Sequence, residues 1–100
     1  MDNLTVVILN KNEEENIIDV IKNAAQLNKN ILIVDSGSID KTVELAKEAG
    51  AQVVYRAWDN DFSAQRNFAL DKVETEWVLY LDADERLTES LIAEIKKSYK

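Results

Sequence analysis

The chain has 100 residues, 46% of them hydrophobic and 31% charged, which suits one small domain with a packed core and a soluble surface. Its formal net charge of −7 argues against nucleic acid or an anionic membrane as the main partner, because both are bound through basic patches. Because cysteine and histidine are both absent, disulfides and the usual zinc ligands are excluded, and any bound metal must be a hard ion held by oxygen.

Apolar runs of strand length alternate with helical patterns along the whole chain. We expect strands at residues 4–9, 31–34, 52–55 and 77–81, and helices at residues 17–25, 41–49, 63–73 and from Thr88 onward. Gly50 follows the second helix at the place of a left-handed C-cap residue. Thr88 is the expected N-cap of the last helix, and Leu87 and Ile92 are spaced to pack as a hydrophobic staple.

This order, βαβαβαβα with near-continuous apolar strands, predicts an α/β fold: a doubly wound, mainly parallel sheet in three layers. Residues 1–100 are interpreted as a single domain, since no linker, repeat or low-complexity segment interrupts them. No apolar run approaches the ~18 residues of a membrane span, and no leader pattern opens the chain. We therefore expect no direct membrane insertion and a cytoplasmic location.

Doubly wound sheets bind ligands outside the carboxyl ends of their strands. Four polar loops are expected to share that rim, at residues 10–13, 35–38, 56–59 and 82–85. These loops are the candidate binding segments.

The last of these loops contains the triplet Asp82-Ala83-Asp84. In an extended segment Asp82 and Asp84 point to the same side, and Ala83 does not obstruct them. Two such carboxylates suit Mg²⁺ or Mn²⁺, which completes its shell with waters and phosphates. The alternative is a solvated acidic turn before a helix, with Asp84 and Glu85 close to the helix N-terminus.

The second loop, VDSGSIDKT, combines a turn glycine with an acid at a strand end. Gly37 allows the backbone a tight turn near a ligand, and Asp35 is placed to accept a hydrogen bond from a base N–H or a ribose hydroxyl. The alternative is a capping loop with Ser38 or Asp40 as the N-cap. Asp35 is the residue that this alternative explains least.

The first loop, NKNEEEN, has no glycine, and no P-loop pattern occurs, which argues against dinucleotide binders and P-loop NTPases. Asn10, Asn12 and Glu13 are candidates for contacts with a nucleobase or ribose. A polar turn with an acidic helix start explains each of them equally well.

The stretch FSAQRNFAL opens the third helix. Arg66 is placed to reach a diphosphate from the rim, or alternatively to pair with Asp59 or Asp61. Trp58 is suited either to stack on a sugar or base or to cover the end of the sheet. The apolar side chains assigned to the core are Phe62, Ala69, Leu70 and Val73.

Together these stretches resemble the N-terminal half of family 2 glycosyltransferases, which are inverting enzymes of the GT-A fold. The resemblance rests on an opening strand followed by NKNEEENI, then VDSGSIDKT, QRNFAL and YLDADE, in that order. It covers essentially the whole chain. The stretch VVYRAWDNDFSAQRNFAL is most similar to the lipopolysaccharide-core glucosyltransferases.

The resemblance implies a strand order of 3-2-1-4 and a nucleoside-diphosphate sugar, such as a UDP-sugar, as donor. Asp35 would bind the uracil or ribose, with the loop from Asn10 through Asn12 to Glu13 bordering the base and Arg66 near the diphosphate. Asp82 and Asp84 match the family's DxD motif. The first would face the ribose, and the last would hold the Mn²⁺ or Mg²⁺ that bridges the diphosphate. One departure is Ile39, where the family usually has threonine, so one loop hydrogen bond is in doubt.

In the family, the acceptor site and the catalytic carboxylate base follow the DxD motif, and Glu85 does not match that base. The chain therefore corresponds to a donor-binding portion truncated after DxD, and no catalytic residue is assigned. The alternative is a self-associating half-domain without activity of its own. We expect a homodimer through the exposed edge of the fourth strand, an apolar edge that invites pairing with another copy.

Overall fold

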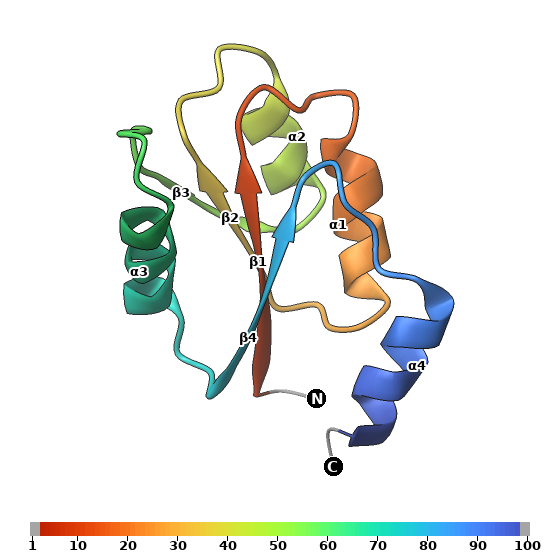
Figure 1. The fold of residues 1–100 in the computed structure, drawn as a ribbon. Helices are drawn as coiled ribbons and strands as arrows, with labels where there is room; N and C mark the ends of the chain where they lie inside the picture. Colours follow the sequence, from red (N-terminus) through yellow and green to blue (C-terminus); the bar gives the residue numbers. More distant parts are fainter. Residues whose placement is uncertain (1–2, 99–100) are drawn as a thin grey trace.

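The computed structural model describes residues 3–98, in which four strands alternate with four helices (Figure 1). The strands are β1 (Leu4–Asn10), β2 (Ile31–Asp35), β3 (Gln52–Tyr55) and β4 (Trp77–Asp82). The helices are α1 (Ile17–Ala25), α2 (Thr42–Glu48), α3 (Phe62–Lys72) and α4 (Glu89–Ser98). The predicted order of elements is confirmed, and the observed ends differ from the expected ones by one residue at most.

The four strands form one parallel sheet in the order β3-β2-β1-β4, as the family resemblance implies. The central strand β1 pairs with β2 on one side and with β4 on the other. This register sets Asn10 opposite Asp35 and Leu9 opposite Asp82. The polar residues at the ends of these three strands therefore lie at one edge of the sheet.

Helices cover both faces of the sheet, which confirms the three-layer architecture. Figure 1 shows α3 on one side of the sheet and α1 and α4 on the other. The larger core cluster joins β1 residues such as Val6 and Ile8 to buried residues of α1, α2 and α4. The smaller cluster lies on the α3 side and contains Val7, Leu32, Val34 and Ala69. Successive β1 residues thus point to opposite layers, as the pleat requires.

Two of the four apolar side chains expected in the core of the α3 region are exposed instead. Phe62 is 62% exposed and Leu70 is 47% exposed, whereas Ala69 is buried and Val73 packs against the smaller cluster. The expectation for Phe62 and Leu70 was wrong because α3 buries only a narrow stripe that includes Gln65 and Ala69. Leu70 lies off this stripe, and Phe62 begins the helix at the rim.

The helix ends follow most of the expected signals. The Thr88 hydroxyl accepts a hydrogen bond from the Leu91 backbone N at 3.0 Å, and Gly50 has a φ of 94°. The N-cap of α2 is Lys41 and not Ser38 or Asp40, although Asp40 accepts a hydrogen bond from the Thr42 backbone N at 2.9 Å just before the helix. No helix within residues 3–98 has both the length and the apolar character needed to cross a membrane.

Candidate functional site

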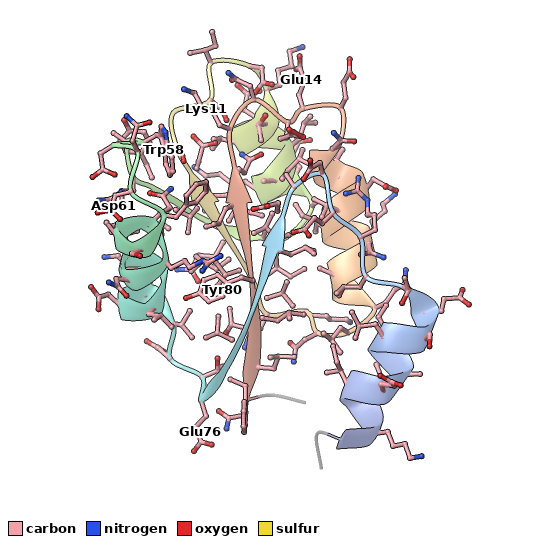
Figure 2. All side chains as sticks on the ribbon, in the orientation of Figure 1. Lys11, Glu14, Trp58, Asp61, Glu76 and Tyr80 are labelled. Carbon is pink, nitrogen blue, oxygen red and sulfur yellow. The ribbon has the colours of Figure 1, made fainter. Side chains whose placement is uncertain are left out.

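The carboxyl ends of the strands bring the predicted binding loops to the same edge of the sheet. Figure 2 shows Lys11, Glu14 and Trp58 near this edge and Glu76 at the opposite end. This edge is where a doubly wound sheet binds its ligand. Some of the predicted residues make contacts that hold the rim together, and others have side chains that remain free at the rim.

Asp35 organises the loop that follows β2. It is only 3% exposed, and its carboxylate accepts hydrogen bonds from Asn10 Nδ2 (2.9 Å), Gly37 N (3.1 Å), Ser38 N (2.9 Å) and the Ser38 hydroxyl. Gly37 has a φ of 114°, a conformation that favours glycine. The carboxylate is thus engaged by protein donors, and its contact with a ribose or uracil stays a prediction.

Asn12 and Glu13 join the first loop to the second. Asn12 N donates to Ser38 Oγ at 2.8 Å, and Asn12 Oδ1 accepts from Ile39 N at 2.8 Å. Glu13 N donates to Thr42 Oγ1 at 2.9 Å. Ile39 takes part through its backbone while its side chain is 93% exposed, so this loop contact does not need a threonine side chain. The polar-turn interpretation of Asn12 and Glu13 therefore accounts for the contacts seen here.

Asn10 differs from these residues because half of its side-chain amide lacks a partner. The residue is 5% exposed, and its Nδ2 is bound to Asp35, but its buried Oδ1 accepts no hydrogen bond from residues 3–98. A buried acceptor without a donor is unfavourable. Asn10 also lines a hollow at the rim.

That hollow has a volume of about 280 Å³ and lies among the ends of β1 and β4 and the start of α3. Its aromatic wall is formed by Trp58 and Phe62, whose ring centroids are 4.8 Å apart in an edge-to-face arrangement. The complete lining consists of Leu9, Asn10, Lys11, Ser36, Trp58, Phe62, Gln65 and Asp82. Trp58 therefore lines a cavity, and this arrangement joins an apolar surface to a few polar groups, as in small-molecule sites.

A polar network at the wall of the hollow, built around the buried Gln65, was missed in the sequence. Gln65 is 1% exposed; its Nε2 donates to Ser36 Oγ at 2.9 Å, and its Oε1 accepts from Arg56 Nη1 at 2.9 Å. Arg56 in turn forms an ion pair with Asp59 at 2.8 Å. The network ties α3 to the loops after β2 and β3. One signal was available, since Gln65 precedes Ala69 by four residues and so shares its buried face.

Arg66 does not pair with Asp59 or Asp61, which was the alternative drawn from the sequence. Asp59 pairs with Arg56, and Asp61 caps α3 by accepting from Ala64 N at 3.0 Å. The Arg66 guanidinium lies over the ring of Tyr80, 5.5 Å from its centroid, and its charge acts on Asp82. Arg66 thus places a cation on the α3 side of the acidic segment.

The acidic segment turns immediately after β4. Glu85 N donates to the Asp82 carbonyl at 2.9 Å, and Glu85 Oε1 accepts from Asp82 N at 2.8 Å. The extended backbone expected for this triplet is therefore not found, because the chain turns at residues 82–85, and the shared direction of the Asp82 and Asp84 side chains stays a prediction. Glu85 is not a helix-start charge either, since α4 begins at Glu89 and Glu85 closes the turn.

Asp82 and Asp84 remain open to solvent. Both are exposed, and neither carboxylate takes part in a hydrogen bond or ion pair within the described part of the chain. Desolvation by the surrounding protein raises the pKa of the Asp82 carboxyl, the negative charges of Glu85 and Asp84 raise it further, and Arg66 opposes them. Additional positive charge at this turn would relieve the repulsion.

The residues of the turn fit a divalent cation only if other ligands contribute. No group of three or more Asp, Glu, Cys or His side chains within residues 3–98 is arranged to hold a metal ion. Mg²⁺ and related ions are commonly held by one or two carboxylates together with waters and substrate phosphates. The free carboxylates of Asp82 and Asp84 meet that requirement.

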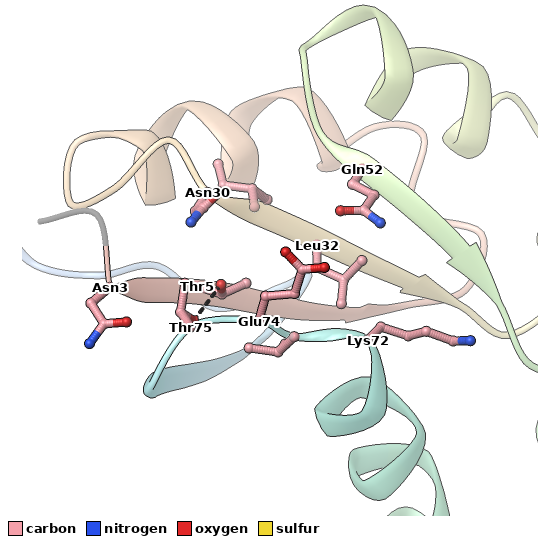
Figure 3. Close-up of a pocket in the computed structure, with 10 residues that line it drawn as sticks. Asn3, Thr5, Asn30, Leu32, Gln52, Lys72, Glu74 and Thr75 are labelled. Atoms are coloured by element: carbon pink, nitrogen blue, oxygen red, sulfur yellow. Dashed lines mark hydrogen bonds between the residues drawn. The ribbon is translucent and has the colours of Figure 1, made fainter.

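A larger hollow of about 440 Å³ lies at the opposite end of the sheet (Figure 3). Its polar lining includes Lys72, Glu74 and the hydroxyls of Thr5 and Thr75, which bond to each other at 2.8 Å. Size alone would favour this hollow, but it lies away from the carboxyl ends at which parallel α/β sheets bind ligands. The rim is therefore the better candidate site.

A parallel sheet with polar loops, an aromatic-walled hollow and free carboxylates at its carboxyl edge defines an α/β ligand-binding domain. Within this class, the chain matches the glycosyl transferase family 2 over residues 5–100 and belongs to that family. The fold expected from the resemblance is thus confirmed together with the family.

Related proteins are longer than this chain. It is 35% identical over 96 residues to an uncharacterized glycosyltransferase of Rickettsia typhi, covering 96% of this chain and 32% of that protein. It is 40% identical over 74 residues to the glycosyltransferase AglJ of Haloferax volcanii, covering 73% of this chain and 24% of that protein. The chain therefore spans about a third or less of these relatives.

Solved structures show the same fold. Glucosyl-3-phosphoglycerate synthase from Mycobacterium tuberculosis, in complex with Mn²⁺, UDP and glucosyl-3-phosphoglycerate, superposes with a TM-score of 0.70 at 26% identity. The match covers 81% of this chain and 33% of the synthase. The same synthase in complex with Mn²⁺, UDP-glucose and phosphoglyceric acid gives a TM-score of 0.69.

Proposed function

We propose that this chain is the donor-binding portion of a metal-dependent, inverting glycosyltransferase that takes a UDP-sugar or a similar nucleotide sugar. The observation that carries the proposal is the position of two unpaired carboxylates, Asp82 and Asp84, with Asp82 lining an aromatic-walled hollow at the carboxyl edge of the sheet. The synthase that shares this fold is solved with Mn²⁺ and UDP-glucose, which supports the donor class and the cofactor.

The hollow suits the nucleoside. Trp58 and Phe62 offer an aromatic surface for a base, and the buried Asn10 Oδ1 is an acceptor for a base N–H or a ribose hydroxyl. Asp35 would contact the uracil or ribose by exchanging one of its present donors, and Asp82 would face the ribose. Asn12 and Glu13 would border the base mainly by holding the first loop in place.

The charged part of the site suits the diphosphate. Asp84, with Asp82, would hold Mn²⁺ or Mg²⁺, and the bound ion would act as a Lewis acid for the departing diphosphate. Arg66, whose positive charge acts on Asp82, would favour the negatively charged leaving group. No residue of this chain is assigned as catalytic base, so sugar transfer is proposed for a longer protein.

Tryptophan fluorescence tests the placement of the nucleoside. The chain has two tryptophans, and Trp77→Phe removes the one at the start of β4 and leaves Trp58 as the sole reporter. Adding UDP with Mn²⁺ should then quench or shift the Trp58 emission with saturation, whereas inorganic diphosphate should have a much smaller effect. A Trp58 signal that does not respond to UDP would contradict the base position.

A second function, self-association, is favoured by the outer edge of β4. This strand pairs with β1 on one side, and no other described strand covers its free edge. Trp77 on this strand is 58% exposed. We propose that two copies meet at this edge. Light scattering should show a dimer that Trp77→Lys dissociates and Trp77→Phe preserves, and a monomer at high concentration would exclude it.

Two finer assignments stay proposals. The cytoplasmic location rests on the sequence, and a role in lipopolysaccharide-core synthesis rests on the resemblance of residues 53–70. A glucosyltransferase assay of a longer protein containing this chain, with lipopolysaccharide-core acceptors, would test the second.

A further inference from the structure

Arg86 connects the acidic turn to the first helix. Its Nη1 donates to the carbonyls of Ala83 at 2.8 Å and of Glu85 at 2.7 Å. Its Nε bonds to Asp19 Oδ2 at 2.9 Å, and its Nη2 lies 3.5 Å from Asn16 Oδ1. One guanidinium thus contacts two backbone carbonyls after β4 and two side chains at the start of α1.

The contacts of Arg86 lie on either side of Asp84, the residue proposed to hold the cation. Ala83 and Glu85 are the two neighbours of Asp84, and the carbonyls of both neighbours accept from the same Nη1. Because no protein donor holds the Asp84 carboxylate itself, its direction depends on this backbone. Arg86 contacts the backbone on both sides of Asp84, and the Glu85 side chain closes the turn by accepting from Asp82 N.

Arg86 forms its ion pair with α1 and not with the acidic turn. Its ion pair is with Asp19 on α1, while Asp82 and Asp84 form none within residues 3–98. The guanidinium therefore shapes the turn without competing for the two carboxylates. An arginine in this position does what a lysine cannot, because a single ammonium group cannot replace the fork of donors.

The segment has a further anchor to α1. The Asn23 side chain donates to the Leu87 carbonyl at 2.9 Å and accepts from the Leu87 N at 2.7 Å. Asn16, which approaches Arg86, also donates to Glu13 Oε2 at 2.9 Å in the first loop. The acidic turn is thus braced against α1, and Arg86 supplies the contacts nearest to Asp84.

We propose that Arg86 is the positioning residue of the acidic turn. It presets Asp84 for a divalent cation and so sets how strongly that cation increases nucleotide affinity. The statement about the cation and nucleotide affinity rests on the proposed function. The statement that Arg86 positions the acidic turn does not rest on it, because it concerns the backbone of residues 83–85 in the free chain.

The test compares Arg86→Lys with Asp19→Asn in the 100-residue chain, using UDP as the probe. In Arg86→Lys we expect UDP affinity measured with Mn²⁺ to fall about tenfold, as for other groups that orient metal ligands, and affinity measured with EDTA to change little. Asp19→Asn keeps the carbonyl contacts and removes an exposed ion pair, so its effect with Mn²⁺ should stay within about threefold.

Hydrogen exchange of the free chain gives an independent measurement. The amides of Ala83 and Glu85, which bond to the carbonyls of Leu9 and Asp82, should exchange faster in Arg86→Lys, while amides of β1 keep their protection. If Arg86→Lys lowers UDP affinity equally with and without Mn²⁺, or if Mn²⁺ raises UDP affinity as much in this variant as in wild type, Arg86 is not a positioning residue. If the wild-type chain itself shows no effect of Mn²⁺, the proposed function fails, and unchanged exchange at Ala83 and Glu85 would then refute the role of Arg86.

Discussion

Asn10 and Asp35 lie side by side at the ends of β1 and β2, and Asn10 Nδ2 donates to Asp35 Oδ1 at 2.9 Å. Both residues are at least nine-tenths buried. This contact joins the first two binding loops, and it leaves Asn10 Oδ1 as an acceptor without a protein partner among the described residues. The rim therefore combines a satisfied carboxylate that builds the loop with a buried amide oxygen that has no partner among the described residues.

Asp35→Ala should lower stability as well as nucleotide binding. It removes the acceptor for Asn10 Nδ2 and for the backbone N–H groups of Gly37 and Ser38. Each buried donor left without a partner costs about 1–3 kcal/mol, and each kcal/mol lowers the melting temperature of so small a domain by roughly 4–8 °C. Thermal unfolding should show this loss, and exposed Asp71→Ala is the control. If Asp35→Ala and Asp71→Ala have the same melting temperature, Asp35 does not organise the loop.

Gln65→Leu should destabilise the fold although it keeps the volume of the side chain. The substitution removes the Gln65 partner of Ser36 Oγ and one of the two acceptors of Arg56 Nη1, which keeps Asp59 Oδ1 at 3.2 Å, at a cost of about 1–3 kcal/mol in urea unfolding. Gln65→Glu can still accept from both groups and should lose less. Equal destabilisation by the two variants would show that shape, and not the polar network, explains the buried glutamine.

Asp82→Asn should make the free chain more stable near neutral pH. Desolvation, Glu85 and Asp84 raise the pKa of the Asp82 carboxyl, so the folded chain holds this proton more tightly than the unfolded chain does. The stabilising effect of the proton is present below the unfolded pKa and is lost as pH rises through the folded value. The variant, which does not ionise, should melt higher than wild type at pH 7, and the gap should close near pH 3, below the ordinary aspartate pKa of about 4.

Thermal unfolding at both pH values, with Asp71→Asn as a matched control, checks this expectation. A lower melting temperature for Asp82→Asn at pH 7 would mean that the charged form of Asp82 stabilises the fold. That result would remove the electrostatic reason for placing a cation at this turn.

The fold was predictable because its signals are local. Apolar runs such as residues 77–81 and helical faces such as residues 17–25 identify their own elements, and alternation then requires a parallel sheet. The strand order came from the family resemblance and was confirmed. The position of the rim was also predictable, because the carboxyl ends of parallel strands meet at one edge of the sheet.

The site was less predictable because burial of a polar side chain depends on partners distant in sequence. Gln65 is buried because Ser36 and Arg56 satisfy it, and these partners precede it in the chain by 29 and 9 residues. The turn after Asp82 is closed by the Glu85 side chain, which overrides the extended geometry expected for an acidic triplet. Arg86 was overlooked for a similar reason, because its partners on α1 precede it by about 70 residues.

Calorimetric titration of the chain with UDP, in Mn²⁺ and in EDTA, tests the central claim most directly when wild type is compared with Asp84→Ala. Wild type should bind UDP more tightly in Mn²⁺ than in EDTA, and Asp84→Ala should lose most of that gain while keeping the weaker metal-independent binding. If wild type does not bind UDP under either condition, or if Asp84→Ala keeps the full effect of Mn²⁺, the assignment of Asp82 and Asp84 to a metal and donor site is wrong.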